Sequence, residues 1–185
     1  IYGNFFWHNP RESLLQASGR VSIHNNVFAD CPSHAAITLR NHDLPVKLVH
    51  IYNNTICSAA RGIRIASAAS EDHAVMGNVV FAGEPLSLHS TITNVRDNIT
   101  GPVADAVLHL VNPQMTLGTL ALHPKPGSCE GTPLDLSPFA TETAFDLDFN
   151  GTSKGERRIR GAYAAKAGWM LQSGIKPPPA PRPKF

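Results

Sequence analysis

The sequence predicts an all-β fold, a parallel β-helix in which short strands wind into stacked coils. Three observations predict it: a composition poor in charge, a short motif that occurs five times, and an alternating apolar segment after each motif. The chain has 185 residues, of which 42% are hydrophobic and 16% are charged, whereas about 25% charged residues are usual in soluble domains. With 14 Gly and 15 Pro, this composition favours strands and tight turns over helices.

The repeated motif gives the strongest indication of the fold. It consists of a β-branched aliphatic residue, a variable residue, a Gly, Asn or Asp, then an Asn and a mostly apolar residue. The asparagines of the five copies are Asn4, Asn26, Asn54, Asn78 and Asn98. Their separations of 22, 28, 24 and 20 residues correspond to one solenoid coil with loops of variable length.

Each motif position has a physical role in such a coil. The aliphatic residue points inward and packs on its equivalents in neighbouring coils. These residues are Ile1, Ile23, Ile51, Val75 and Val95. The third position tolerates the left-handed backbone that a sharp corner requires. The corner residues are Gly3, Asn25, Asn53, Gly77 and Asp97. The asparagine side chains that follow can hydrogen-bond to one another along the stack and form an asparagine ladder.

A second apolar segment follows each ladder asparagine by roughly ten residues. These segments alternate between apolar and polar residues, as half-buried strands do. They are Leu14–Leu15, Ile37–Leu39, Ile63–Ile65, Leu86–Leu88 and Val107–Leu110. We expect them to form another wall of the solenoid.

The rhythm of the repeat stops after about residue 112, and this divides the chain into three parts. Residues 1–111 are expected to form about five coils, of which the first is incomplete. Residues 112–175 are expected to form a cap that closes the stack, because a last coil without one presents unpaired strand edges. Residues 176–185 form a Pro-rich tail, which is expected to be extended or disordered.

The coil motif, of the form Ile-x-Asn-Asn-x-Phe/Ile, resembles that of the right-handed parallel β-helix proteins of the pectate-lyase-like superfamily. The C-terminal part is also similar to theirs, with Pro126–Cys129, Asp148–Gly151 and Gly161–Ala164 matching three elements near the end of many bacterial members. Cys129 and Ala164 depart from the Pro and Glu of those elements. The resemblance implies a right-handed solenoid with an irregular C-terminal cap, and several further coils before residue 1 in family members.

The same resemblance implies an extracytoplasmic setting, because the members are usually secreted, periplasmic or attached to the cell surface. It does not select an activity, because the superfamily includes polysaccharide lyases and hydrolases, epimerases, tailspikes and adhesins. Hydrolases need two or three carboxylates gathered on one face. No acidic residue in the repeats stands in register with another acid one coil away, so the catalytic residues are unknown.

The outward-facing residues of the first wall form the candidate ligand-binding patch. Counting back from the ladder asparagines places Tyr2, His24, His50, Tyr52 and Arg96 on this face. Tyrosine and histidine rings stack on sugars, and an arginine pairs with a uronate or sulfate group. A Tyr/His pair could also serve as acid and base in β-elimination. Alternatively, these residue types occupy exposed strand positions only because of their β-propensity and solubility.

Metal sites receive little support from the sequence. The histidines show no HxH or HExxH spacing, and the three cysteines show no zinc-site spacing. Cys31, Cys57 and Cys129 are expected to be small buried residues or to form one optional disulfide. The segment Asp146-x-Asp148-x-Asn150-Gly resembles the start of a calcium loop, but its twelfth position is Arg157 instead of a bidentate Glu. A turn is the preferred interpretation, with a weak Ca²⁺ site as the alternative.

Charge and hydropathy exclude two classes of partner. The net charge is only +2 and the basic residues are scattered, so nucleic-acid binding is not expected. The apolar runs are too short for a transmembrane segment.

The leading hypothesis is an extracytoplasmic protein, non-catalytic in this segment, that recognises a polysaccharide or a partner protein along its solenoid face. One alternative is a polysaccharide lyase or glycoside hydrolase whose carboxylates lie in coils missing from this chain. Another is an accessory subunit of a larger assembly, in which residues 176–185 dock on the partner. Glycan binding without cleavage would favour the first, release of unsaturated or reducing-end products the second, and co-purification at fixed stoichiometry the third.

Overall fold

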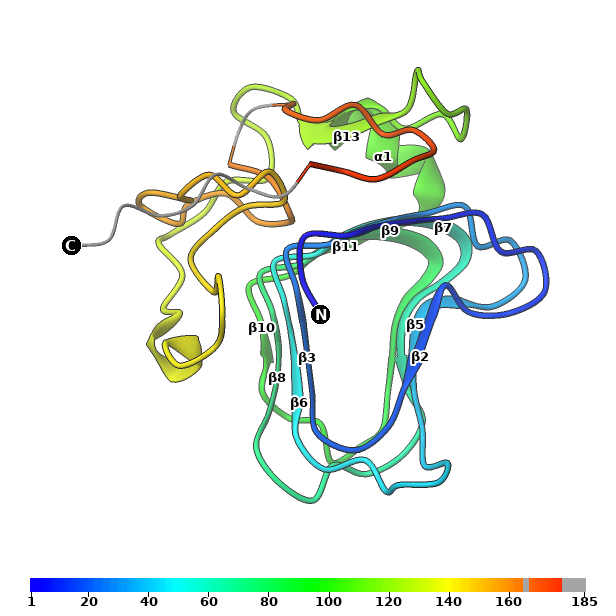
Figure 1. Cartoon of the computed structure of the whole chain (residues 1–185), viewed down its shortest axis with the longest axis vertical. Coiled ribbons are helices and arrows are strands. Elements are labelled where there is room, and N and C mark those ends of the chain that lie inside the picture. Colours follow the sequence, from blue (N-terminus) through cyan, green and yellow to red (C-terminus); the bar gives the residue numbers. More distant parts are fainter. Residues whose placement is uncertain (165–166, 178–185) are drawn as a thin grey trace.

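The protein is a parallel β-solenoid of about four turns (Figure 1). The computed structural model describes residues 1–164 and 167–177. Three walls of parallel strands enclose the core, and the view in Figure 1 is along the stack of coils. The expectation of an all-β fold built from stacked coils is therefore confirmed.

The first wall carries the aliphatic half of the motif. It consists of β3 (Val21–His24), β6 (Val49–Tyr52), β8 (His73–Met76) and β10 (Val95–Arg96), hydrogen-bonded in that order. Register is set by the motif, because Ile23 pairs with Ile51, Ile51 with Val75, and Val75 with Val95.

The second and third walls share two long strands. The second wall contains β1 (Phe5–Trp7), β4 (Val27–Ala29), the first halves of β7 (Thr55–Ile65) and β9 (Val79–Leu88), and β11 (Ile99–Gly101). The third wall contains β2 (Leu15–Ala17), β5 (Ala35–Leu39) and the second halves of β7 and β9. The pairing between β7 and β9 shifts between Ser58 and Arg61, where both strands bend from one wall into the next.

The predicted asparagine ladder is present at the corner between the first and second walls. The Nδ2 group of each asparagine donates to Oδ1 of the next, with distances of 3.1, 3.1, 3.0 and 2.9 Å from the Asn4–Asn26 pair to the Asn78–Asn98 pair. All five predicted corner residues have positive φ, between 53° and 69°. Ile23, Ile51 and Val75 are fully buried, as predicted for inward-facing positions.

The prediction that Val107–Leu110 forms the last strand of the third wall is wrong. Ala106–His109 forms a short helix, α1, after a 3₁₀ turn at Val103–Asp105. Val107 and Leu108 are 53% and 65% exposed, so they do not line the solenoid. The chain leaves the coil after Pro102 and continues into a hairpin of β12 (Leu110–Asn112) and β13 (Ala121–Pro124).

The C-terminal segment packs beside the solenoid and not across its end. In Figure 1 the described residues after 112 lie outside the outline of the coils. They form a second core with the outer face of the second wall, which includes Val27, Cys57, Val79 and Phe81. The segment thus removes an apolar outer face from water, and it does not lie over the end of the stack as was expected of a cap.

Backbone hydrogen bonds fix this segment to the coils. The N–H of Gly161 donates to the carbonyl of corner residue Gly77 (2.7 Å), and the N–H of Ala162 donates to Thr55 Oγ1 (2.8 Å). Gly161 has φ +84°, and a Cβ there would lie 2.6 Å from Thr55 Oγ1. Glycine is therefore required where the segment touches the wall.

Replacing Asn54 with Ala should lower the free energy of unfolding by about 2–4 kcal/mol, because the buried N–H of Asn26 loses its acceptor and the Nδ2 group of Asn26 loses one of its acceptors. Equilibrium urea denaturation measures this loss. Asn4→Ala is the matched control, since Asn4 holds the same position but is exposed and its Oδ1 accepts no hydrogen bond among the described residues. The control should lose about 1 kcal/mol or less. Equal losses in the two variants would contradict the ladder as the main polar support of the stack.

Candidate functional site

The first-wall patch predicted from the sequence is assembled but mostly covered. Tyr2, His24 and Tyr52 lie on successive coils and stack, with ring centroids 5.3 Å and 4.6 Å apart. Tyr2 is 42% exposed, whereas His24, His50 and Tyr52 are only 2%, 6% and 0% exposed. The expectation that these residues share one exposed face is therefore wrong for the three in the middle.

Arg96 lies apart from the rest of the patch. It is on β10, at the far end of the first wall from Tyr2. It is exposed, donates to Asn94 Oδ1, and has Nε 3.9 Å from the Asp97 carboxylate. It therefore does not form one site with the stacked rings.

The cover over the patch comes from a stretch of the C-terminal segment around the 3₁₀ turn η2 (Ser137–Phe139). The Phe139 ring stacks on Tyr52 at a centroid distance of 4.1 Å and an interplanar angle of 4°. Leu134 and Leu136 are buried in the same cluster. Sequence reasoning missed this contact because it joins residues about 90 positions apart with no repeat between them.

Glu142 is the polar centre of the covered face. Its Oε1 lies 2.6 Å from His50 Nδ1, and its Oε2 accepts a hydrogen bond from the Tyr52 hydroxyl (2.9 Å) and another from Ser22. The other ring nitrogen of His50, Nε2, is 3.1 Å from Asp72 Oδ2. A single carboxylate thus joins the C-terminal segment to two adjacent coils.

The hydrogen bonds around Glu142 outweigh the effect of burial on its ionisation. Burial opposes the charged carboxylate, but the groups of His50, Ser22 and Tyr52 lower the pKa of Glu142 below its ordinary value of 4.5. Burial also opposes the imidazolium, but Glu142 and Asp72 raise the pKa of His50 above 6.5. Burial and the Glu142 charge raise the pKa of Tyr52, so Tyr52 stays a neutral hydrogen-bond donor. The cluster therefore stabilises the contact between the C-terminal segment and the first wall.

The outer face of the third wall is open and basic. Two adjoining hollows of about 270 and 280 Å³ lie on it and share Gln16 and Arg40. Arg61 and Arg64, both exposed, line the first hollow on the next coil. Arg61 pairs with Glu84 at 2.6 Å, whereas the guanidinium groups of Arg40 and Arg64 make no hydrogen bond or ion pair within the described residues.

A sequence signal for this face was available. Ile63-Arg64-Ile65 alternates, with both isoleucines buried, so Arg64 must point outward. The register places Arg64 beside Thr38, and Thr38 beside Gln16. The outward positions of the second apolar segments, read in the same way as those of the first wall, would have indicated this face.

The predicted calcium segment uses its polar groups internally. Asp148 Oδ1 accepts from the N–H groups of Asn150 and Thr152, and Oδ2 accepts from Ala164. The Asn150 side chain accepts from the N–H of Trp169. In the part of the chain that the structure describes, no group of three or more His, Cys, Asp or Glu could hold a metal ion. A Ca²⁺ site here stays a prediction.

The three cysteines, Cys31, Cys57 and Cys129, are free thiols in buried positions. Burial raises the pKa of Cys57 to about 12 and that of Cys129 to about 11, so neither is a reactive thiolate at neutral pH. They pack as small apolar residues, which was the preferred expectation.

Comparison with known proteins gives no match: no protein-family model fits the chain, and no curated protein and no solved structure is significantly similar to it. Membership of the pectate-lyase-like superfamily therefore stays a prediction. Among residues 1–164 and 167–177, no helix has the length and apolar character needed to cross a membrane.

Replacing Glu142 with Gln should destabilise the protein most between about pH 4.5 and 6.5. Folding lowers the pKa of Glu142, so its contribution is complete above about pH 4.5 and is lost as the pH falls through the folded value. Folding raises the pKa of His50, so its contribution is complete below about pH 6.5 and is lost as the pH rises through the folded value. The expected loss is about 1–3 kcal/mol at pH 5.5.

Urea denaturation at pH 3, 5.5 and 8.5 measures this dependence. Glu156→Gln is the control, because Glu156 is 78% exposed and pairs with Arg158 on the surface, where an ion pair contributes about 0–1 kcal/mol. A loss from Glu142→Gln that is the same at all three pH values would rule out the proposed ion pair with His50.

Proposed function

We propose that the protein recognises an acidic polysaccharide on the outer face of its third wall. The observation that carries the proposal is the pair of exposed guanidinium groups, Arg40 and Arg64, that make no hydrogen bond or ion pair within the described residues and border two connected hollows, although Arg64 lies close enough to Glu84 for their charges to interact. Arginine binds carboxylate and sulfate groups through paired N–H donors.

The position of the other residues supports a polymeric ligand. Adjacent coils lie about 4.8 Å apart, so Gln16, Thr38 and Arg64 on β2, β5 and β7 stand at short, regular steps. Thr38 itself is only 5% exposed and its hydroxyl bonds to Ser13, so Gln16 and Arg64 are the groups that face outward. His34 adds a further hydrogen-bonding group to the same hollow. A long shallow surface of this kind suits a chain of repeating sugar units better than a compact small molecule.

The proposal moves the leading sequence hypothesis from one face of the solenoid to another. The middle of the first wall is covered by Phe139 and Glu142, and much of the second wall by the C-terminal core. The third wall is the face on which the described structure leaves cationic side chains exposed over connected hollows.

Cleavage of the polymer is not part of the proposal. Of the residues that line the two hollows, only Glu12 is a carboxylate, whereas most glycoside hydrolases use two. The lyase or hydrolase alternative, with its carboxylates in further coils, stays a prediction. The accessory-subunit alternative relied on residues 176–185, of which 178–185 lie outside the described residues.

We also infer a right-handed solenoid and a pectate-lyase-like ancestry from the resemblance of the coil motif. An extracytoplasmic location is consistent with the proposed ligand, since acidic structural polysaccharides lie outside the cytoplasm. Detection of the native protein in secreted, periplasmic or surface fractions would test that location.

Arg64→Ala should weaken binding to polygalacturonate about tenfold, and the Arg40→Ala/Arg64→Ala double variant should weaken it further, because each change removes charge-assisted hydrogen bonds. Isothermal titration calorimetry at 50 and 300 mM NaCl measures the affinity, which should fall at the higher salt concentration.

Arg158→Ala is the matched control, because Arg158 is an exposed arginine that lies on the C-terminal segment and pairs with Glu156. Wild-type affinity in the double variant would refute the proposal. Shortening of the polymer during the titration would favour the lyase or hydrolase alternative.

A further inference from the structure

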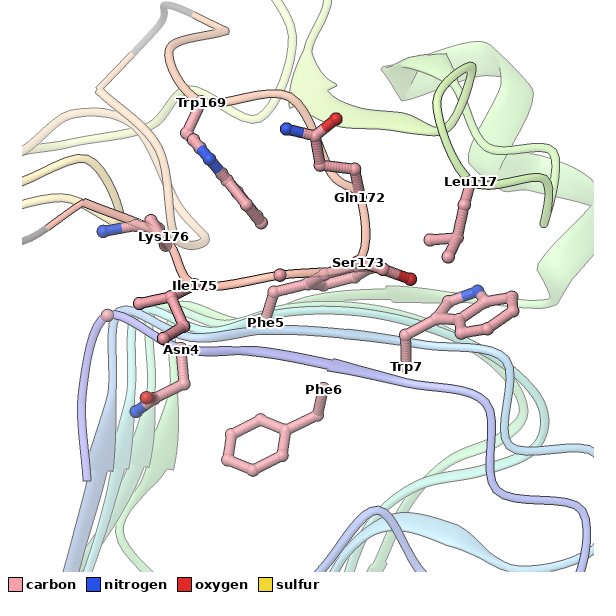
Figure 2. Close-up of a pocket in the computed structure, with 12 residues that line it drawn as sticks. Asn4, Phe5, Phe6, Trp7, Leu117, Trp169, Gln172, Ser173, Ile175 and Lys176 are labelled. Atoms are coloured by element: carbon pink, nitrogen blue, oxygen red, sulfur yellow. The ribbon is translucent and has the colours of Figure 1, made fainter.

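A second hollow, separate from the arginine face, lies between the second wall and the C-terminal end of the described chain. It has a volume of about 510 Å³, within the range of small-ligand sites in proteins. Figure 2 shows its main side chains: Phe5 forms the floor, while Trp169 and Trp7 stand on opposite sides. Phe6 points away from the hollow into the space enclosed by the coils (Figure 2).

Three aromatic rings give this hollow its apolar character. The Phe5 and Trp169 rings meet edge to face with centroids 6.4 Å apart. Trp169 is held by its backbone N–H, which donates to Asn150 Oδ1 (3.0 Å), and by contact with the Phe149 ring. A rigid ring of this kind offers contact area with little loss of conformational entropy.

Polar groups border the same rings. Gln172 and Ser173 lie on the strand-like segment that passes over Phe5, and Lys176 lies at the end near Asn4 (Figure 2). Gln172 and Ser173 are exposed, and their side chains make no hydrogen bond within the described residues. A purely apolar ligand in the hollow would leave these polar groups facing nonpolar atoms, which is unfavourable.

The indole nitrogen of Trp7 points to a missing partner. Trp7 Nε1 is shielded from solvent and has no acceptor among the described residues, although buried donors are nearly always paired. A ligand with several hydroxyl oxygens can supply an acceptor directly or through a water that it brings.

The segment that covers the hollow, Gln172–Lys176, is loosely packed. Gly174 has φ +114°, and Ile175 is 95% exposed, so the segment from Gln172 to Lys176 makes few packing contacts at its middle. Small shifts of this segment can open access to Trp7 without disturbing the second core.

From these observations we propose that the hollow is a second binding site, which takes a neutral sugar residue stacked on Trp169 and Phe5 and hydrogen-bonded by Gln172 and Ser173. Faces of sugar rings are apolar while their edges carry hydroxyl groups, which matches aromatic walls with a polar border. The site is independent of the arginine face, because it shares no residue with those hollows.

Intrinsic fluorescence provides a direct assay, because the protein has two tryptophans and both line this hollow. Titration with cellohexaose, mannohexaose and xylohexaose should give a saturable change in emission for at least one of them, unchanged between 50 and 300 mM NaCl. Gln172→Ala should weaken that binding at least fivefold, and Trp169→Ala at least tenfold by calorimetry. Gln172 is exposed, so its variant should fold normally.

Met170→Ala is the matched control, because Met170 is 52% exposed beside Trp169 but does not line the hollow. The Arg40→Ala/Arg64→Ala variant should keep neutral-sugar binding, so failure of the arginine-face proposal would leave this one standing. The proposal would be overturned if none of the three hexasaccharides gave a saturable change up to about 10 mM. It would also be overturned if Gln172→Ala and Trp169→Ala both bound with wild-type affinity.

Discussion

The repeating contact between coils is the constraint on which the rest of the structure depends. Each inner coil buries an aliphatic residue, a corner residue with positive φ and an asparagine that donates to the next, as at Ile51, Asn53 and Asn54. Ser22, His50 and Tyr52 face Glu142 from adjacent coils because β3 and β6 pair residue by residue. Arg64 lies one coil from Thr38 for the same reason. The sites on the outer faces are therefore consequences of an inner register that asparagine and β-branched residues set.

The C-terminal segment decides which of these faces can meet a ligand. It buries the apolar outer face of the second wall and places Phe139 and Glu142 over the first. The segment thus resembles a bound partner more than an end cap, since it uses ring stacking and a charge-assisted hydrogen bond as protein interfaces do. The half-buried rings of the second-wall hollow and the exposed arginines of the third wall lie where this cover ends.

The parts of the structure that repeat were predictable from the sequence, and the parts that do not repeat were not. The ladder asparagines, the corner residues and the inward isoleucines recur at coil spacing, so local patterns located them. Val107–Leu110 has the apolar content of a wall strand, but it follows Pro102 and folds as a helical turn. The burial of Tyr52 depends on Phe139 and Glu142, and no local pattern connects residues so distant in the chain. The prediction of the binding face failed for the same reason. The sequence placed it on the first wall, and nothing in the repeat showed that the C-terminal segment covers that wall.

The central claim is that an acidic polymer is recognised on the third wall, because the C-terminal segment covers most of the first and second walls. Hydrogen–deuterium exchange with and without an oligogalacturonate of six or more residues tests it most directly. The account predicts slower exchange in β2, β5 and the second half of β7, with no change in residues 134–145. Slower exchange on the first wall, together with faster exchange in residues 134–145, would show that the ligand displaces the cover and would contradict the account.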